Sequence, residues 1–340
     1  MHAFLDERDR YVTYGITAEH FRFFFSNFIP EVTIHSKAQD ERIVRGHYDR
    51  GNDFFGWFLG ERMIYTAAFF KNGPTNTTLE EAQDEKMNRV CKKLMLEPGE
   101  KLLDVGCGWG TLARHAAVNF GADSTGITIS KNQTEFGNAR IEKAGVADRA
   151  RILCLDYRDI PKRQFDKIVS LEMVEHVGVK NLQKFFDQMY GLLKDDGNFL
   201  LQWTGLRRGG DEGIAPIGLR PEDLIWGLFM NKYIFPGADA SLPLSEMMKY
   251  AEKSKFEVRS VENVGMQYAW TLKKWHDNWV SNRQAILDTY GERWYRIWHL
   301  FLAWSVKIGE QGNAAAFQVV FNKNINSYDR TKYVGKEVPV

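Results

Sequence analysis

The chain has 340 residues, 44% hydrophobic and 26% charged, and its 45 basic and 44 acidic side chains leave a net charge of +1. This balance gives no electrostatic basis for binding nucleic acid. We find no apolar run of the ~20 residues that a membrane span needs, no signal-peptide layout, and only three cysteines, too widely spaced to predict disulfides or a metal site. The aromatic content of 14% is unusual. It predicts a large apolar pocket or contact with a lipid surface.

Residues 1–100 have the pattern of an N-terminal helical region. The stretch HFRFFFSNFIP (20–30) gathers aromatic residues and is compatible with either a core helix or a helix at a membrane interface. Residues 78–96 follow helical spacing, with Thr78 as the expected N-cap and acidic residues in the first turn.

From residue 101 the pattern alternates between apolar strand segments and helical segments. The expected strands cover residues 101–105, 124–130, 151–156, 165–172 and 197–205, and the expected helices cover 111–120, 131–145 and 180–195. Repeated strand–helix units with continuous apolar strands predict an α/β fold, a Rossmann-like doubly wound and mainly parallel sheet.

Residues 206–245 break this rhythm because they are rich in Gly and Pro, and they predict an inserted helical lid. A helix, a strand, an aromatic helical block and a last strand are expected after it, at 245–256, 256–265, 269–308 and 315–324. The predicted organisation is an N-terminal region (1–100), a main domain (101–325) that contains the lid and the aromatic block, and a C-terminal tail (326–340).

The first expected strand runs into three glycines in KLLDVGCGWG (101–110), a turn that lets the backbone approach a nucleotide closely. The spacing is not that of the full dinucleotide motif, and the second strand ends in Thr128, Ile129 and Ser130 without the acid that a dinucleotide ribose requires. The pattern D-x-G-x-G-x-G resembles the S-adenosylmethionine (SAM) site of class I methyltransferases. The alternative is a structural glycine turn in another doubly wound protein. Asp156, at a following strand end, suits an adenine amino group and favours SAM.

Several stretches then occur in the order found in one family: HYDRGNDFFGWFLGERMIYTAAFF (47–70), LLDVGCGWG (102–110), GITISKNQ (126–133), LDYRDI (155–160), MVEHVG (173–178) and NKYIFPG (231–237). They resemble the cyclopropane fatty acid synthase superfamily of SAM-dependent lipid methyltransferases over residues 40–325. Within it, the stretches LIWGLFMNKYIFPGADAS (224–241) and ERWYRIWHLFLAWS (292–305) are most similar to the sphingolipid 9-methyltransferases, which methylate the long-chain base of glucosylceramides. Members of that group usually carry N-terminal membrane spans; we find none in this sequence, so we expect either a trimmed form or a soluble relative.

The resemblance implies a set of SAM-binding residues. Tyr65 and Thr66 would contact the methionine end of SAM, Asp104, Gly106 and Gly108 would form the loop beneath it, Thr128 and Gln133 would reach the ribose, and Asp156, Tyr157 and Arg158 would surround the adenine. The N-terminal region would close over the cofactor and the lipid, and the lid residues Phe229, Tyr233 and Phe235 would line an acyl-chain tunnel.

The resemblance also implies the reaction. An alkene of a lipid chain would take the methyl group, and a base would remove a proton from the resulting carbocation, so water must be excluded. In cyclopropane synthases this base is a bound bicarbonate, held by a Glu, a Tyr, a His and groups beside a Cys. These positions match Glu175, Tyr268, Gln202 and Ala67. The His-to-Gln and Cys-to-Ala changes weaken the expectation of bicarbonate and shift the expected product from a cyclopropane towards a methyl branch.

We therefore predict a SAM-dependent C-methyltransferase for a sphingoid base, with Glu175, Tyr268 and Gln202 as catalytic residues. The alternatives are a cyclopropane-forming phospholipid enzyme, a small-molecule N-methyltransferase, and a non-catalytic SAM- or lipid-binding protein. The expected partners are a long unsaturated lipid and a membrane surface, on the cytoplasmic face of the endoplasmic reticulum if the source is eukaryotic. His176 and the pair Arg207–Arg208 are interpreted as structural or solvated rather than functional.

Overall fold

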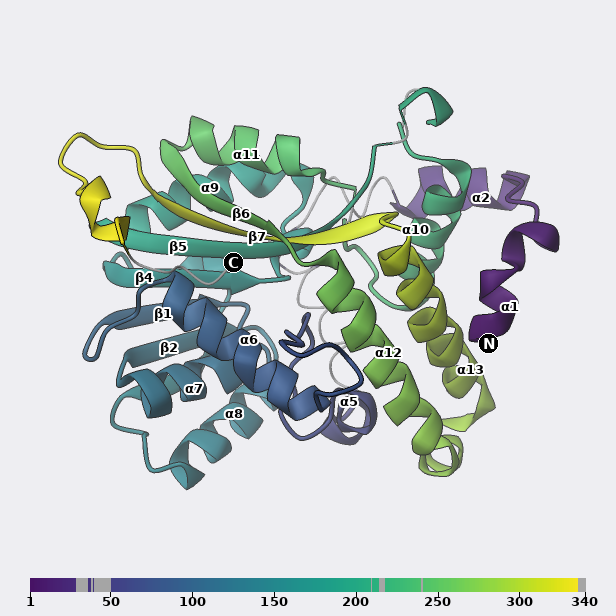
Figure 1. Cartoon of the computed structure of the whole chain (residues 1–340), viewed down its shortest axis with the longest axis horizontal. Helices are drawn as coiled ribbons and strands as arrows, with labels where there is room; N and C mark the ends of the chain where they lie inside the picture. The colour runs from purple at the N-terminus through teal and green to yellow at the C-terminus, as the bar shows by residue number, and fades with distance from the viewer. Residues whose placement is uncertain are drawn as a thin grey trace.

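The computed structural model describes residues 1–28, 36–37, 39, 50–208, 210–213, 218–239 and 241–335. The end of the aromatic 20–30 stretch, the start of HYDRGND, part of the lid and the last five residues of the tail lie outside these described residues. Within them the chain forms a seven-stranded sheet with helices on both faces (Figure 1).

The strand order is β3-β2-β1-β4-β5-β7-β6. The strands span Lys101–Val105 (β1), Asp123–Thr128 (β2), Ala150–Cys154 (β3), Phe165–Leu171 (β4), Leu193–Leu206 (β5), Phe256–Asn263 (β6) and Ala314–Lys323 (β7). Strands β1 to β5 pair in parallel, and β7 runs antiparallel to both β5 and β6. The predicted doubly wound, mainly parallel sheet is confirmed, and its order reverses between β1 and β4, where such folds bind their ligands.

Helices cover both faces of the sheet because successive strand residues point to opposite sides. Leu102 packs with one group of helices and Leu103 with the other. The helices on one face are α9 (Leu182–Leu192) and α11 (Leu244–Lys253), and those on the other are α6 (Leu79–Lys93), α7 (Thr111–Phe120) and α8 (Lys131–Lys143) (Figure 1). The expected helix at 180–195 ends three residues early, because Leu193 already pairs with Phe165 of β4.

Helix α6 begins as the sequence predicts. The Thr78 hydroxyl accepts a hydrogen bond from the Glu81 N–H at 3.2 Å, and the Glu81 carboxylate accepts one from the Thr78 N–H at 2.8 Å. This reciprocal capping box satisfies two N–H groups that the first helical turn leaves without helical partners. The buried residues of α6 include three polar side chains, Gln83, Lys86 and Lys93, so this helix carries two cations into the interior.

A helical hairpin of α12 (Gly265–Ser281) and α13 (Arg283–Glu310) lies beyond the carboxyl ends of the parallel strands (Figure 1). It packs against α5 (Asn52–Leu59) and α10 (Pro221–Tyr233). Trp275, Trp279 and Trp298 of the hairpin are fully buried against the phenylalanines of α5. The aromatic block therefore builds a second hydrophobic core, separate from that of the sheet.

The chain begins with two short helices, α1 (His2–Asp6) and α2 (Ala18–Phe23), which lie beside α13 and α10 (Figure 1). Phe23 and Phe24 pack against the cluster around α10, whereas Phe21 and Phe25 are 52% and 62% exposed. Among the described residues, none of the helices combines the length and the apolar character needed to cross a bilayer.

Candidate active site

Two cavities meet at the carboxyl edge of the sheet. The first, which we call the cofactor bowl, encloses about 1260 Å³ and is walled by the ends of β1, β2, β3 and β4 and by residues 63–66. All ten residues expected to bind SAM line it: Tyr65, Thr66, Asp104, Gly106, Gly108, Thr128, Gln133, Asp156, Tyr157 and Arg158. Segments from five places in the sequence therefore converge on one cavity.

The glycine loop after β1 supplies the floor of the bowl. Gly106 and Gly108 have φ of +78° and +53°, a region that disfavours side chains. A Cβ on Gly106 would lie 2.4 Å from Cγ of Met173, so this glycine is required for packing. A Cβ on Gly108 would meet nothing within 4 Å, so at this position the bare backbone borders open space. The loop thus leaves room for a ligand at Gly108 and packs tightly at Gly106.

Polar side chains on the rim of the bowl form hydrogen bonds with one another, and these bonds hold them in place. The Thr128 hydroxyl donates to Oε1 of Gln133 at 2.6 Å. The Asp156 carboxylate accepts from the backbone N–H and Nε of Arg158, at 2.9 Å and 2.8 Å. Since both Asp156 oxygens bond to Arg158, this ion pair presents a preorganised edge of donors and acceptors at the position expected for adenine.

Charges buried beneath the bowl form an excess of acid over base. Burial raises the pKa of Asp104 to about 7, against the attraction of the Lys86 ammonium. Burial likewise lowers the pKa of Lys86 to about 8, while Glu172 and Asp104 stabilise its charged form. Two buried carboxyl groups therefore face one buried ammonium, and a cation placed in the bowl would relieve the imbalance. SAM carries such a cation at its sulfonium, so these residues fit it.

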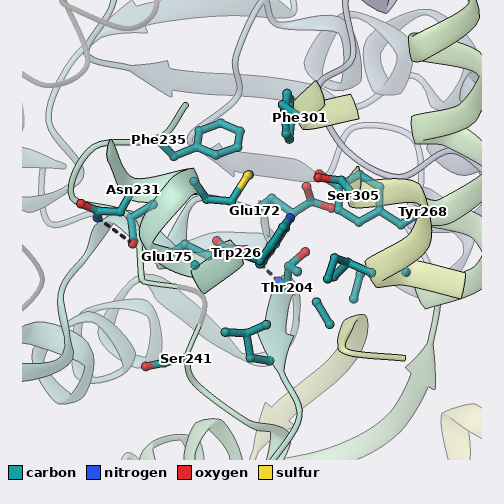
Figure 2. A pocket seen from close by; sticks show the side chains of 18 of the residues that line it. Glu172, Glu175, Thr204, Trp226, Asn231, Phe235, Ser241, Tyr268, Phe301 and Ser305 are labelled. Atoms are coloured by element: carbon teal, nitrogen blue, oxygen red, sulfur yellow. Dashed lines mark hydrogen bonds between the residues drawn. The ribbon is translucent and has the colours of Figure 1, made fainter. Parts of the chain in front are cut away.

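The second cavity, which we call the lipid cavity, encloses about 1190 Å³ between β5, α10, α12 and α13. Its wall is mainly apolar and includes Trp226, Phe235, Tyr268 and Phe301 (Figure 2). A few polar side chains, among them Asn231, Ser241 and Ser305, interrupt this wall. A long apolar chamber with few polar groups is suited to an acyl chain or another extended hydrocarbon.

Three residues line both cavities: Tyr65, Glu172 and His176. Glu172 follows β4 directly, and its φ of +55° is unusual for a residue with a side chain. Its carboxylate accepts hydrogen bonds from Nε2 of Gln202 and from the Ala67 N–H, the latter at 3.4 Å, and the nearby Tyr268 hydroxyl also lowers its pKa. Figure 2 shows Glu172 and Tyr268 side by side at this junction.

Glu175 lies three residues further on, in the wall of the lipid cavity. Its Oε1 accepts from the Thr204 N–H at 2.8 Å (Figure 2), and its buried Oε2 has no partner among the described residues. Burial, the neighbouring Glu172 carboxylate and Asp239 raise the pKa of Glu175 to about 8. Glu175 is therefore mostly protonated at neutral pH.

A row of polar side chains crosses the sheet behind Glu172. The strand register places Gln202 of β5 opposite Gln318 of β7, and Gln318 opposite Glu262 of β6. The Lys93 ammonium donates to Gln318 at 2.8 Å, and the Gln318 amide donates to Oε1 of Gln202 at 2.7 Å. Because Oε1 of Gln202 is occupied in this way, its NH2 group must face Glu172.

The structure therefore brings the predicted catalytic residues together around Glu172, a residue that sequence reasoning missed. Tyr268 and Glu175 line the lipid cavity, whereas Gln202 is fully buried behind Glu172. An acid directly after a parallel strand was the available signal for Glu172. For Lys86, the signal was a lysine on the buried stripe of a helix.

The structure changes several interpretations that the sequence suggested for residues outside the catalytic set. His176 was expected to point elsewhere, yet it lines both cavities. Arg207 was expected to be solvated, but its Nε pairs with the fully buried Asp223 at 3.1 Å. Of the lid aromatics, Phe235 lines the lipid cavity, while Phe229 and Tyr233 pack beside it. Among the described residues, no group of three or more His, Cys, Asp or Glu side chains is placed to hold a metal ion.

The sheet order, the glycine floor and the two joined cavities define a class I SAM-dependent methyltransferase fold. The crystal structure of mycolic acid cyclopropane synthase CmaA1 with SAH and CTAB has this fold, with a TM-score of 0.77 and 28% identity, and the alignment covers 86% of this chain and 100% of that one. Sphingolipid C9-methyltransferase of Komagataella phaffii is 48% identical over 98% of this chain and 68% of its own length. Cyclopropane-fatty-acyl-phospholipid synthase of Escherichia coli is 34% identical over 86% and 71%.

The family described as mycolic acid cyclopropane synthetase matches residues 35–319. The chain belongs to this family, as its motifs predicted. It spans 61–68% of the length of the curated sphingolipid C9-methyltransferases that it matches. Its identity to these relatives exceeds its identity to the bacterial cyclopropane synthase.

Proposed function

We propose that this protein is a SAM-dependent C-methyltransferase that places a methyl branch on an alkene carbon of a sphingoid base. The observation that carries the proposal is the junction between the cofactor bowl and the lipid cavity, where Tyr65, Glu172 and His176 belong to both walls. The 48% identity to a sphingolipid C9-methyltransferase supports the choice of lipid. The chain would bring a methyl donor and a long hydrocarbon into contact away from bulk water.

When bound, SAM supplies an electrophilic methyl group to the alkene. The residues of the bowl hold it: the glycine loop offers bare backbone, Thr128 and Gln133 offer hydroxyl and amide groups, and the pair Asp156–Arg158 offers a polar edge. The buried carboxyl groups of Asp104 and Glu172 favour the cationic end of the ligand over a neutral one.

The lipid cavity orients the hydrocarbon and excludes water, which would add to a carbocation. Aromatic rings of Tyr65, Phe235, Tyr268 and Phe301 border it. Their π faces stabilise positive charge without donating a lone pair to it. Among the described residues, the same wall also places the carboxyl group of Glu172 at the junction.

We also propose that the lipid is taken up at a membrane surface, on the cytoplasmic side in a eukaryotic cell. Phe4, Tyr11, Phe21 and Phe25 are all more than half exposed and lie in the first 25 residues. Helix α2 contacts α10, whose residues line the lipid cavity. An apolar surface beside that cavity is suited to the interfacial region of a bilayer.

The experiment that tests the reaction uses SAM with a trideuterated methyl group. The protein is incubated separately with ceramide and glucosylceramide carrying an unsaturated base, and with unsaturated phospholipid, and the products are read by mass spectrometry. We expect three deuterium atoms on the sphingoid base. Two deuterium atoms on a fatty acyl chain would show cyclopropane closure instead. No label in either lipid, with SAH still bound in calorimetry, would overturn the proposal.

Membrane contact is tested by sedimentation with phosphatidylcholine–phosphatidylserine vesicles. We expect the double variant Phe21→Ser/Phe25→Ser to lose vesicle binding while its affinity for SAH stays the same. As a matched control we choose Val118→Ser, an exposed apolar residue on α7 far from α2. Equal vesicle binding by the double variant and the wild type would remove α2 from this role.

A further inference from the structure

We propose that Glu172 is the base of the reaction, so that a carboxylate of the chain itself accepts the substrate proton and no bicarbonate is bound. The proposal rests on the proposed function, because it names the proton acceptor for that methyl transfer. It begins from position: Glu172 lines both the cofactor bowl and the lipid cavity. A base must reach a C–H bond next to the cationic carbon that methyl transfer leaves, and this junction is where the two reactants meet.

The groups around Glu172 are those expected around a bound bicarbonate. By resemblance these were Tyr268, Gln202 and the backbone beside residue 67. In the structure the Gln202 amide and the Ala67 N–H donate to the Glu172 carboxylate, and the Tyr268 hydroxyl lies close enough to it to lower its pKa. Two of the three groups are thus already used as donors, and the third faces the same carboxylate. The site does not fit bicarbonate, because a further anion would meet the two carboxyl groups of Glu172 and Glu175 there.

The side-chain amide of Gln202 is held in a single orientation. This orientation suits a neighbouring carboxylate better than that of a freely rotating amide would. The chain of bonds from Lys93 through Gln318 fixes its oxygen away from Glu172 and its NH2 group toward it. Gln202 and Gln318 are both buried, so neither can turn without leaving a buried polar atom unsatisfied. Gln202 and Gln318 are therefore positioning residues for Glu172.

The backbone at Glu172 is consistent with this role. A left-handed φ of +55° on a glutamate costs about 1 kcal/mol or more and persists only when its surroundings impose it. The Glu172 N–H is held by the carbonyl of Gln202 at 2.8 Å. The same strand neighbour therefore fixes both the backbone and the carboxylate of Glu172.

The charges around the pair determine which acid is ionised. Burial raises the pKa of Glu172, but Lys86, Gln202, Tyr268 and the Ala67 N–H favour its charged form. Glu175 has one donor, the Thr204 N–H, and its pKa rises to about 8. The surroundings of the two acids therefore favour the negative charge on Glu172 and the proton on Glu175.

The proton step balances within the substrate and the side chain. The alkene pair forms the new C–CH3 bond and leaves a cation on the neighbouring carbon. One oxygen of Glu172 takes a proton from the adjacent CH2, and the two electrons of that C–H bond form the new double bond. Glu172 becomes a neutral carboxylic acid and later releases this proton to solvent. Loss from the chain carbon keeps all three hydrogens of the transferred methyl, which gives the branched product.

The test compares wild type, Glu172→Gln and Glu172→Gly in buffer freed of carbon dioxide and in buffer with added bicarbonate. We expect wild-type turnover to be the same in both buffers. Glu172→Gln should lose about 100-fold or more in turnover, in line with the loss of a general base, and keep its affinity for SAH. Glu172→Gly suits the left-handed φ, vacates the carboxylate position and frees its donors. Its turnover should rise at least tenfold with bicarbonate.

The outcomes separate this proposal from the proposed function. If the wild type produces no labelled lipid, the proposed function is overturned. The binding of carbon-13 bicarbonate, read by NMR without any lipid, then decides whether Glu172 or bicarbonate occupies the position of the base. We expect Glu172→Gly to bind bicarbonate and the wild type not to. Bicarbonate binding by the wild type, loss of its turnover without bicarbonate, or more than a tenth of turnover left in Glu172→Gln would each overturn the proposal. If Glu172→Gly fails to fold, the wild type and Glu172→Gln still decide it.

Discussion

The cofactor bowl and the lipid cavity lie side by side but are built in different ways. The bowl is formed by short segments at strand ends, and each segment carries a recognisable motif, such as Asp104–Gly108 after β1 or Asp156–Arg158 after β3. The lipid cavity is formed by the sides of long helices, α10, α12 and α13, which are far apart in sequence and carry no motif of that kind. Local patterns therefore predicted the residues of the first cavity better than those of the second.

The tryptophans show this difference most clearly. Six of them lie between residues 270 and 304, and they contribute to the aromatic content from which a large apolar pocket or a lipid contact was predicted. Within the described part of the chain, none of the six lines either cavity. Trp275, Trp279 and Trp298 instead fill the core between α5 and the hairpin, and the cavity takes its aromatic wall from Trp226, Phe235 and other residues. The amino-acid composition indicates how much aromatic surface the fold buries, but it does not show which elements this surface packs against.

The largest expected effect concerns this core. Trp298→Ala removes a fully buried side chain, and we expect the free energy of unfolding to fall by ~3–5 kcal/mol. Urea unfolding measures it. Trp294→Ala, at a partly buried position on the same helix, is the control and should cost less. A large loss of turnover with unchanged stability in Trp298→Ala would instead place this residue at the substrate.

The bowl can be disrupted separately by filling the space above Gly108. Gly108→Leu should weaken binding of SAH about 100-fold in calorimetry, because its side chain would occupy the open space that the bare backbone leaves. Gly145→Leu is the matched control: Gly145 also has a left-handed φ and nothing within 4 Å of an added Cβ, but it does not line the bowl. If both variants bind SAH equally well, the assignment of Gly108 to the floor of the bowl is contradicted.

The lipid cavity can be narrowed without touching the bowl. Ser305 lies on α13 and lines only the lipid cavity. We expect Ser305→Phe to lower kcat/KM for the lipid about tenfold while SAH binding is unchanged. Thr289→Phe, at an exposed position of the same helix, should leave both values as they are. A parallel loss of SAH affinity in Ser305→Phe would show that the two cavities are not independent.

The smallest effect is a dependence of stability on pH. The pKa values of Asp104 and Glu175, about 7 and about 8, lie above those of unfolded chains, near 4. Between pH 4 and 7 these two groups bind more protons in the folded protein, so they lower the free energy of unfolding as pH rises. Burial lowers the pKa values of His115 and His276 to about 4, and these two groups act in the opposite direction below about pH 6.5. Each group contributes at most ~1.4 kcal/mol per pH unit. The lowered pKa of Lys86, about 8, acts in the opposite direction only above this window.

Urea unfolding of the ligand-free protein at pH 5.5 and 7.5 measures this slope. Glu175→Gln should shift the slope towards positive values, because glutamine does not titrate and the falling contribution of Glu175 is lost. SAH lacks the sulfonium cation, so SAM should reduce the slope more than SAH does. The same slope in Glu175→Gln and the wild type would mean that Glu175 is ionised throughout this range.

Sequence reasoning predicted the strand–helix alternation from 101 onward, the Thr78 cap and the position of the glycine loop, because each of these depends on neighbours within a few residues. The resemblance to the family named the ten residues expected to bind SAM, and the structure brings them to one bowl because parallel strands end at one edge. Sequence reasoning missed Glu172, although an acid stood at a strand end, because the Glu175 motif three residues later explained the acidic position by itself.

The amino-acid sequence by itself determined the class of fold, the glycine floor and the family, since periodicity and short motifs act locally. Only the tertiary structure decided which carboxylate stands at the junction of the two cavities. That choice depends on the register that aligns Gln202 with Gln318, on Lys86 reaching inward from α6, and on Tyr268 arriving from α12. Some of these contacts join residues that are more than a hundred positions apart in the sequence. No local pattern encodes which of these residues meet.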